Sequence, residues 1–300
     1  MTNNEVRIVE VGARDGLQNE VPVPLAAKQE LVESLVDAGI KNIEVGSFVS
    51  PKWVPQMADS GALFQQLCRV DGVDYMALTP NLKGLQAAID AKASEVAIFA
   101  SASESFSQKN INCSIDESIQ RFSEVMALAK QHNLPVRGYV SCVLGCPYEG
   151  EVELEAVARV AAQLYQLGCY QISLGDTIGV GTPDKAAAMV SAVAKQVPVE
   201  ALALHFHDTY GQALANINAC LPLGIRCFDS AVAGLGGCPY AAGASGNLAT
   251  EDLLYMLHGQ GYQTGIDLLA VAKAGDSICK TLGRSNGSKV AQAVLAKTNK

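Results

Sequence analysis

Eight short apolar runs with strand character recur along the 300-residue chain, and helical patterns separate them. Between the first two runs, Leu31, Leu35 and Val36 recur at helical spacing, and Gly39 then ends the helix. Strict alternation of this kind indicates parallel strands joined by helical crossovers. Eight units favour a closed α/β barrel, the (β/α)8 or TIM barrel, over a doubly wound sheet. The predicted strands are 6–11, 42–46, 74–78, 95–100, 136–141, 170–174, 201–206 and 227–233.

No linker, low-complexity segment or block of like charges interrupts this series. We therefore predict a single barrel domain over residues 1–300, with two or three extra C-terminal helices after about residue 252 packed on the barrel. An apolar content of 49% is sufficient for its core. The predicted helices before this tail are 26–38, 61–68, 82–91, 115–131, 154–167, 183–195 and 212–221.

The net charge of −8 argues against a nucleic acid or an anionic membrane as partner. Nine cysteines, an odd number without a CxxC pair, indicate reduced thiols in a reducing compartment. No apolar run reaches the length of about 18 residues that a membrane span needs. The chain begins without a secretory or transit pattern. We expect a cytoplasmic protein, although a processed organelle protein would have the same features.

His205 and His207 carry the clearest chemical signal. They are two residues apart at the end of a predicted strand, so both imidazoles point to the same side of the sheet. Imidazole is a common metal ligand, and α/β enzymes place their chemistry at the carboxyl ends of parallel strands. The alternative is two histidines that backbone partners satisfy. The motif alone does not decide between a metal site and this structural role.

Other polar residues follow the same ends of the predicted strands, namely Arg14, Asp15, Glu44, Ser47, Asp176 and Asn247. Closure of a barrel makes the eighth strand a neighbour of the first and the seventh, so Asp15, both histidines and residues after the eighth strand can converge. A carboxylate, two imidazoles and an amide oxygen suit an octahedral divalent ion such as Mg²⁺, Mn²⁺ or Co²⁺. A structural zinc site would need more thiolates. An arginine beside the ion would attract an anionic oxygen.

Each of these residues also has a structural alternative. Asp15 and Asp176 can cap turns, and Glu44 can form a buried ion pair with Arg14. Cys238 lies in a glycine-rich loop and is the best candidate for a reactive thiol, whereas we expect Cys142 and Cys146 to be packing residues. This loop lacks the GxGxxG and GxxxxGK[ST] patterns, so it is either another kind of phosphate cradle or a flexible lid.

Motifs along nearly the whole predicted barrel resemble the hydroxymethylglutaryl-CoA lyases. This family belongs to a wider group of metal-dependent barrel enzymes that includes isopropylmalate and homocitrate synthases. The GLGGCPYA and GASGN patterns are specific to the lyases, while RDG and HxHD are shared across the group. The segments are VEVGARDGLQNE (9–20), NIEVGSFVSPKWVPQMADS (42–60), QKNINCSIDES (108–118), SCVLGCPYEGEV (141–152), ISLGDTIGVGTP (172–183), HFHDTYGQALANI (205–217) and AVAGLGGCPYAAGASGNLATEDLLYML (231–257).

The resemblance implies roles for individual residues. Arg14 would stabilise an enolate oxygen, and Cys238 would be a catalytic thiol on a mobile loop of residues 234–246. Glu44 and Asp176 would be supporting acids, and Glu251 would help to position the metal ligands. The implied ligands of Mg²⁺ or Mn²⁺ are Asp15, His205, His207 and Asn247, and we assign cofactor binding to Ser47, Gly236 and Gly237. Val21 departs from the family, since a lysine is expected at this position in many members.

The implied reaction is a retro-Claisen cleavage of 3-hydroxy-3-methylglutaryl-CoA to acetyl-CoA and acetoacetate, a step of leucine degradation and ketone-body formation. His205 or Asp176 would remove the hydroxyl proton, and a homodimer is expected from the resemblance. The first alternative is a Claisen condensing synthase or an aldolase of the same group. The chain ends at Lys300 without a long regulatory domain and carries the loop around Cys238, and both features favour the lyase. The second alternative, an inactive barrel that binds metal or CoA, is disfavoured by the presence of Arg14 and Cys238.

Overall fold

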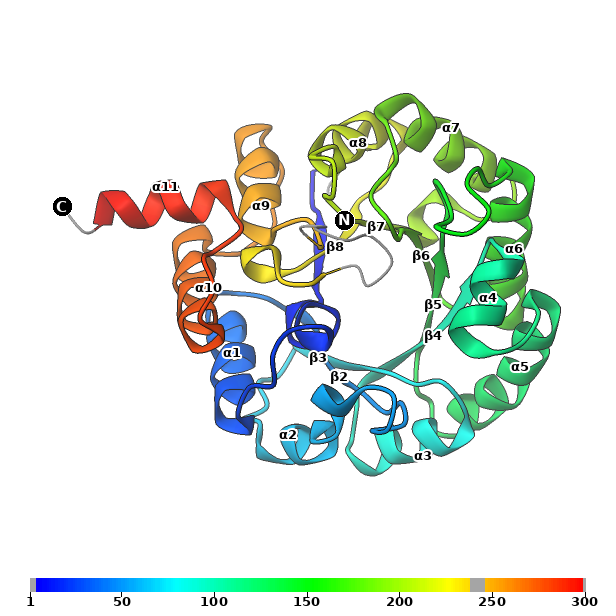
Figure 1. The fold of residues 1–300 in the computed structure, drawn as a ribbon, viewed down its shortest axis with the longest axis horizontal. Coiled ribbons are helices and arrows are strands. Elements are labelled where there is room, and N and C mark those ends of the chain that lie inside the picture. The colour runs from blue at the N-terminus through cyan, green and yellow to red at the C-terminus, as the bar shows by residue number, and fades with distance from the viewer. Residues whose placement is uncertain (1–3, 238–245, 299–300) are drawn as a thin grey trace.

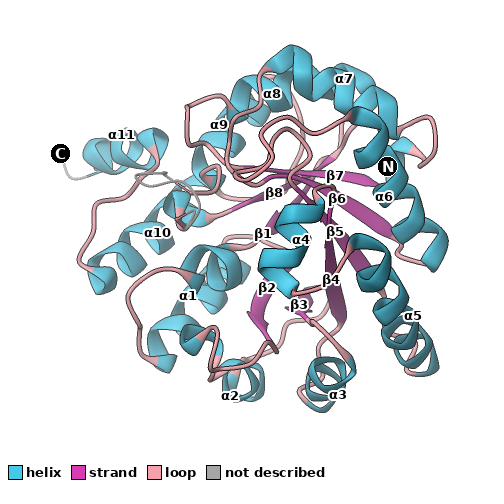
Figure 2. Ribbon diagram, turned by 45° about the vertical axis from the view of Figure 1, so that its right-hand side comes forward, coloured by secondary structure: helices cyan, strands magenta, loops and turns pink. Residues whose placement is uncertain are grey.

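Parallel hydrogen bonding between the first and last strands closes the sheet into a barrel. The structure, a computed structural model, describes residues 4–237 and 246–298. Its eight strands follow one another around the ring in chain order, and helices surround them (Figure 1, Figure 2). The predicted (β/α)8 barrel with C-terminal helices is confirmed. The strands are β1 (Arg7–Glu10), β2 (Asn42–Ser47), β3 (Asp74–Leu78), β4 (Glu95–Ser101), β5 (Val136–Ser141), β6 (Gln171–Asp176), β7 (Leu202–Phe206) and β8 (Cys227–Ser230).

Seven crossover helices match the predicted positions to within a few residues. They are α1 (Leu25–Asp37), α2 (Ser60–Gln66), α3 (Leu82–Asp90), α5 (Ile115–Gln131), α6 (Leu154–Leu167), α7 (Pro183–Val193) and α8 (Ala213–Cys220). The structure adds α4 (Glu104–Ile111), which the sequence reading missed. This short helix buries only Phe106 and Ser107, so it has no apolar stripe to reveal it. Its ends are marked locally, by the Ser103 side chain that accepts the Phe106 N–H and by Asn112 in the left-handed conformation.

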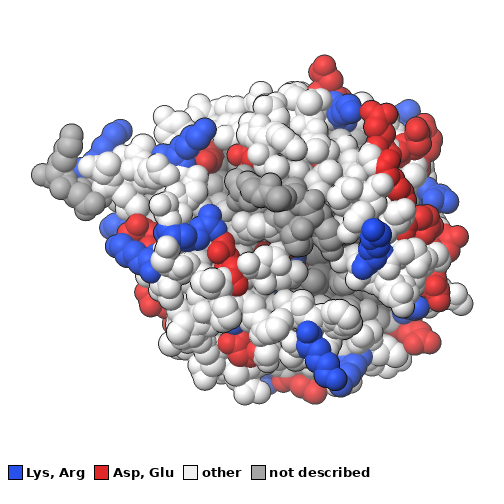
Figure 3. Space-filling model, in the orientation of Figure 1, with Lys and Arg blue, Asp and Glu red and all other residues white. Residues whose placement is uncertain are grey.

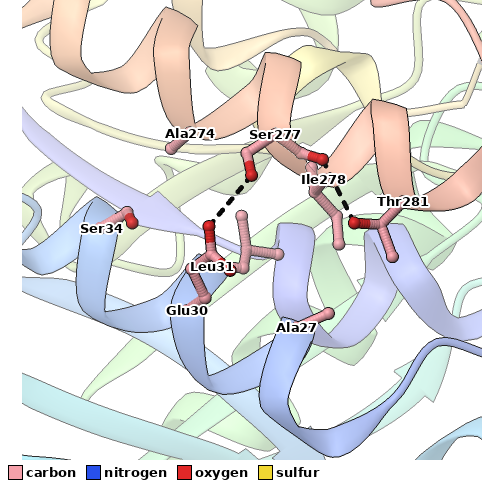
Figure 4. Close-up of a pocket in the computed structure, with 8 residues that line it drawn as sticks. All are labelled: Ala27, Glu30, Leu31, Ser34, Ala274, Ser277, Ile278 and Thr281. Atoms are coloured by element: carbon pink, nitrogen blue, oxygen red, sulfur yellow. Dashed lines mark hydrogen bonds between the residues drawn. The ribbon is translucent and has the colours of Figure 1, made fainter.

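Three helices follow the barrel and fill the side between α8 and α1. They are α9 (Thr250–Gly259), α10 (Leu268–Leu282) and α11 (Lys289–Thr298) (Figure 1). Helix α10 packs along α1, where the Ser277 hydroxyl donates to Glu30 over 3.1 Å (Figure 4). The cavity left between these two helices is only about 10 Å³, the space of about one water molecule. No helix of the described residues is long and apolar enough to cross a membrane.

The chain after β1 forms a wide turn over Gly12–Gly16, closed by the Gly16 N–H, which donates to the Val11 carbonyl over 3.0 Å. Such π-type turns place side chains in directions that a regular helix would not. Gly16 lies against the segment that follows β8, because a Cβ atom on it would lie 2.8 Å from the Leu235 Cβ. The absence of this one carbon lets the turn that carries Arg14 and Asp15 approach the end of β8.

The last strand ends three residues before the predicted boundary. Beyond Ala231 the backbone turns, since Ala233 and Gly234 have φ of 58° and 60°. The backbone N–H groups of Val232 and Ala233 then donate to the carboxylates of Glu10 and Glu251 instead of to a neighbouring strand. Two acidic side chains therefore hold the chain where β8 leaves the sheet.

Both of these carboxyl groups are fully buried, and among the described residues neither forms a salt bridge with a lysine, arginine or histidine. Burial raises the pKa of Glu10 to about 7, against hydrogen bonds from Thr250, Val232 and Gly12 that lower it. Burial, together with the nearby Glu10, raises the pKa of Glu251 to about 8. The folded chain thus holds protons at these two sites that the unfolded chain releases near pH 4.5.

This pKa shift predicts a loss of stability with rising pH. Below about pH 4.5 Glu251 is protonated in both states, and between about 4.5 and 8 the unfolded chain binds fewer protons, so the free energy of unfolding falls. Glu251→Gln stays neutral and should reduce this fall, as measured by urea unfolding across that pH range. The control is Glu124→Gln on an exposed position of α5. A variant profile as steep as that of the wild type would contradict the prediction.

Candidate active site

Three side chains converge at the carboxyl end of the barrel. Asp15 follows β1, while His205 and His207 lie at the end of β7, and one ligand atom from each lies within 4.8 Å of the others. The two imidazole centroids are 5.5 Å apart. Because β8 pairs with both β1 and β7, barrel closure brings Asp15 beside histidines about 190 positions away in the chain.

The chemistry of this group fits a divalent cation. Burial and the neighbouring His205 lower the pKa of His207 to about 4, so its imidazole is neutral and keeps a lone pair near pH 7. Its Nδ1 is buried and has no hydrogen-bond partner within residues 4–237 and 246–298. Burial alone would raise the pKa of Asp15, but Arg14 and the two imidazoles lower it below its usual range. A carboxylate and two imidazoles are suitable ligands for a divalent metal ion.

Asn247 lies beside this group but does not present its oxygen to it. Its amide nitrogen donates to Asp15 Oδ2 over 2.8 Å and to the Leu235 carbonyl over 3.2 Å. Its backbone forms a bridge with His207. The amide oxygen is the atom that binds cations, so Asn247 would have to rotate its amide by half a turn to act as a ligand.

Arg14 is fixed between two carboxylates. Its Nε donates to Glu44 Oε2 and its Nη1 to Asp15 Oδ1, both over 2.6 Å. Burial would lower the pKa of Arg14, but Glu44 and Asp15 raise it above its ordinary range. The buried ion pair that the sequence offered as an alternative role for Glu44 is therefore present, although it does not exclude a part in catalysis. The two contacts set the plane of the guanidinium beside the metal-ligand group.

His205 has a partner that the sequence analysis missed. Its Nδ1 lies 3.2 Å from Asp229 Oδ2, and its Nε2 lies 3.9 Å from Asp15 Oδ2. Asp229 in turn binds Arg137, which reaches across the barrel interior from β5 to β8. The available signal was a charged residue inside each of two apolar predicted strands, since a buried charge requires a partner.

The Asp176 carboxylate binds the loop that follows β6. The carboxylate accepts the backbone N–H groups of Val180 and Gly181 over 3.2 and 2.8 Å, as a turn cap does. Burial raises its pKa to about 6 despite these hydrogen bonds. It does not line the cavity described below, whereas its neighbours Gly175 and Thr177 do.

The remaining predicted residues occupy different positions around the site. Ser47 is buried at the end of β2, where its hydroxyl accepts the Val49 N–H. Gly236 packs on Asn247, since a Cβ on it would lie 2.9 Å from the amide nitrogen. Gly237 lines the cavity, and its carbonyl accepts a hydrogen bond from Asn19. Cys238, the predicted thiol, lies outside the described residues.

A cavity of about 1410 Å³ opens over the metal-ligand group. This volume exceeds the 300–1000 Å³ that is common for small-ligand sites, as a long ligand would require. The face seen in Figure 3 carries lysines and arginines interspersed with acidic side chains. The lining includes Arg14, Asp15, His205 and His207, the exposed Trp53, and the cationic side chains of Lys83, Lys109 and Arg121.

The sequence matches the HMGL-like family over residues 5–278. A Pseudomonas aeruginosa protein named 3-hydroxy-3-isohexenylglutaryl-CoA/hydroxy-methylglutaryl-CoA lyase is 60% identical, and the match covers 98% of each chain. The cytoplasmic lyase of Danio rerio is 60% identical over 96% of this chain and 86% of its own. The mitochondrial lyase of Bos taurus is also 60% identical, over 96% of this chain and 89% of its own.

Solved structures agree with these sequence relatives. The hydroxymethylglutaryl-CoA lyase of Pseudomonas aeruginosa superposes with a TM-score of 0.96 at 60% identity, covering 98% of both chains. An HMG-CoA lyase from Acinetobacter baumannii, solved with coenzyme A and 3-methylmalate, gives 0.93 at 37% identity, covering 98% of this chain and 96% of that one. The protein therefore belongs to the HMGL-like family, and its relatives at this level of identity are hydroxymethylglutaryl-CoA lyases.

Proposed function

We propose that the protein is a carbon–carbon lyase that cleaves 3-hydroxy-3-methylglutaryl-CoA to acetyl-CoA and acetoacetate. The observation that carries this proposal is the group of Asp15, His205 and His207 with Arg14 beside it, at the base of a cavity large enough for an acyl-CoA. The names of the relatives support the substrate. The coenzyme A in the Acinetobacter baumannii structure supports acyl-CoA binding in this barrel.

Asp15, His205 and His207 would hold a divalent cation, which we propose to be Mg²⁺ or Mn²⁺, with Asn247 as a fourth ligand if its amide turns. A cation bound there would lower the pKa of the substrate hydroxyl and orient the substrate. The protein's own part is to supply two imidazoles and a carboxylate in fixed positions, at the end of the barrel where closure has brought them together.

Arg14 would stabilise the enolate oxygen of the departing acetyl-CoA. Its guanidinium is held by Glu44 and Asp15, so little reorientation is needed when negative charge develops. Because this interaction becomes stronger as the enolate charge develops, it should lower the activation free energy of cleavage more than it tightens substrate binding. Glu44 would then act by positioning Arg14.

Proton transfer involves His205, Asp176 and Cys238. His205 lines the cavity, whereas Asp176 faces backbone N–H groups, and this difference supports His205 as the group that reaches the substrate. A neutral imidazole has one lone pair, so for His205 binding the cation and accepting the hydroxyl proton are alternatives at any one moment. The choice of base stays a prediction, as does protonation of the enolate by Cys238.

Two further expectations stay predictions. We propose a homodimer, on the resemblance to the family alone. We also propose a cytoplasmic location, and the relatives at 60% identity include both cytoplasmic and mitochondrial proteins.

The reaction is tested by incubating the purified protein and Mn²⁺ with 3-hydroxy-3-methylglutaryl-CoA. We expect equal amounts of acetoacetate and acetyl-CoA, because a retro-Claisen step releases one of each. The comparison reaction supplies acetyl-CoA with a 2-oxo acid and measures free CoA. Consumption of acetyl-CoA there, without cleavage in the first assay, would favour the condensing synthase and overturn the lyase.

Arg14→Gln should lower kcat by about 10²-fold, as removal of an oxyanion donor does, while KM changes far less. Steady-state kinetics measure both constants. Arg159→Gln is the control, because Arg159 lies exposed on α6. A rise in KM with unchanged kcat would contradict the enolate role of Arg14.

His207→Ala should abolish metal retention, because it removes one of the three converging ligands. The measurement is the Mn²⁺ content after dialysis, with circular dichroism to verify the fold. His258→Ala, at an exposed position of α9, should retain Mn²⁺ as the wild type does. Stoichiometric Mn²⁺ in the dialysed His207 variant would rule out the ligand assignment.

A further inference from the structure

We propose that Asp229, held by Arg137, is a positioning residue that fixes His205 with its proton on Nδ1 and its Nε2 lone pair toward the metal-ligand group. The proposal rests on the proposed function, since it deepens the assignment of His205 in the same site. The proposal thus extends the site by two residues of the barrel interior, Asp229 next to the His205 imidazole and Arg137 next to Asp229.

The oxygens of Asp229 are surrounded by hydrogen-bond donors. Oδ1 accepts from Arg137 Nη2 over 2.7 Å, and Oδ2 accepts from Arg137 Nη1 over 2.9 Å and from the Ser173 hydroxyl over 2.8 Å. The paired contacts with the guanidinium match the bidentate geometry typical of an ionised carboxylate. Asp229 therefore has only acceptors to offer to His205 Nδ1, 3.2 Å from Oδ2.

This arrangement determines the tautomer of the imidazole. A neutral histidine has one N–H and one lone pair, and the partner of one nitrogen sets the state of the other. When Nδ1 donates to Asp229, the lone pair must lie on Nε2, the nitrogen that faces Asp15. In metal sites such an outer carboxylate orients the ring and raises the basicity of the ligand nitrogen.

The positive charge of Arg137 allows the buried Asp229 carboxylate to be ionised. Arg137 and Asp229 have no solvent-exposed side-chain surface, and a single buried charge would be very costly. The guanidinium is held further by Gln171, which accepts from Nε over 2.9 Å, and by the Tyr139 ring, 5.1 Å from Cζ. The same Tyr139 ring makes a T-shaped contact with the His205 imidazole, with centroids 5.9 Å apart and ring planes at 81°.

The positions of Arg137 and Asp229 also explain why they are not ligands themselves. Arg137 extends from β5 to β8, strands that are not neighbours in the ring, so the pair spans the barrel interior. Neither residue belongs to the group of converging ligand atoms, and neither lines the cavity. Asp229 reaches the site through His205, whereas Arg137 also donates to the Tyr139 hydroxyl over 3.1 Å, and Tyr139 lines the cavity.

The first experiment needs no variant and no metal. ¹⁵N-labelled wild-type protein without metal is studied at about pH 8, where an unperturbed imidazole is neutral, by NMR of ring nitrogens and carbon-bound protons. Single His→Gln variants assign the four histidines. We expect a protonated Nδ1 for His205, and the usual mixture of tautomers for the exposed His132. A His205 ring protonated on Nε2 would overturn the proposal.

The second experiment removes the pair and measures Mn²⁺ affinity by electron paramagnetic resonance. In the double variant Arg137→Met, Asp229→Leu both buried charges are replaced by apolar side chains, an exchange that proteins often tolerate. We expect Mn²⁺ affinity to fall by about 10- to 100-fold, as for other outer-shell changes, while the melting temperature is retained. Unchanged affinity would overturn the proposal.

The matched control is Arg7→Met, Glu95→Leu, which removes another ion pair, 3.6 Å long, between β1 and β4. It should change Mn²⁺ affinity by less than about twofold, because neither residue contacts His205. If the Asp229 double variant does not fold, the wild-type tautomer still decides the question. A failure of the proposed function would be seen in the lyase assay. It would not alter the NMR result, because the tautomer of His205 is measured without substrate or metal.

Discussion

Closure of the barrel by β1–β8 pairing is the constraint on which the site depends. The register that sets Glu10 opposite Ser230 also places the Gly12–Gly16 turn beside the ends of β7 and β8. Asp15 can then approach two histidines from the other end of the chain. An open sheet of the same strands would separate these groups by the width of the molecule. The buried carboxyl groups of Glu10 and Glu251 stabilise this junction through hydrogen bonds, and their ionisation at higher pH destabilises it.

The fold was predictable because its sequence signals are local and repeated. They are eight apolar runs, each followed by a helical pattern. The convergence of Asp15, His205 and His207 was predictable as a consequence of that topology, as was the pairing of Glu44 with Arg14. The single-domain organisation and the individual catalytic roles stay predictions. Cys238, to which part of the proposed chemistry is assigned, lies outside the described residues.

Other features were not readable from sequence, for physical reasons. Helix α4 buries two side chains and therefore lacks a period, and the early end of β8 depends on carboxylates from distant elements. The link between Asp229 and Arg137 joins positions 92 residues apart on strands that do not pair. This link forms because both side chains point into the barrel. Alternation along a strand predicts which side chains point inward, but only once the first and last residues of the strand are known.

The turn after β1 has a consequence for how this protein can change over evolutionary time. Arg14 and Asp15 are sequence neighbours in a turn whose length is set by backbone hydrogen bonds from Arg14 and Gly16 to the Val11 carbonyl. Most loops on a barrel rim tolerate insertions and deletions. Here a single added or lost residue would displace the guanidinium and the carboxylate together. New specificities are therefore expected to arise through the other rim loops, while this segment keeps a constant length.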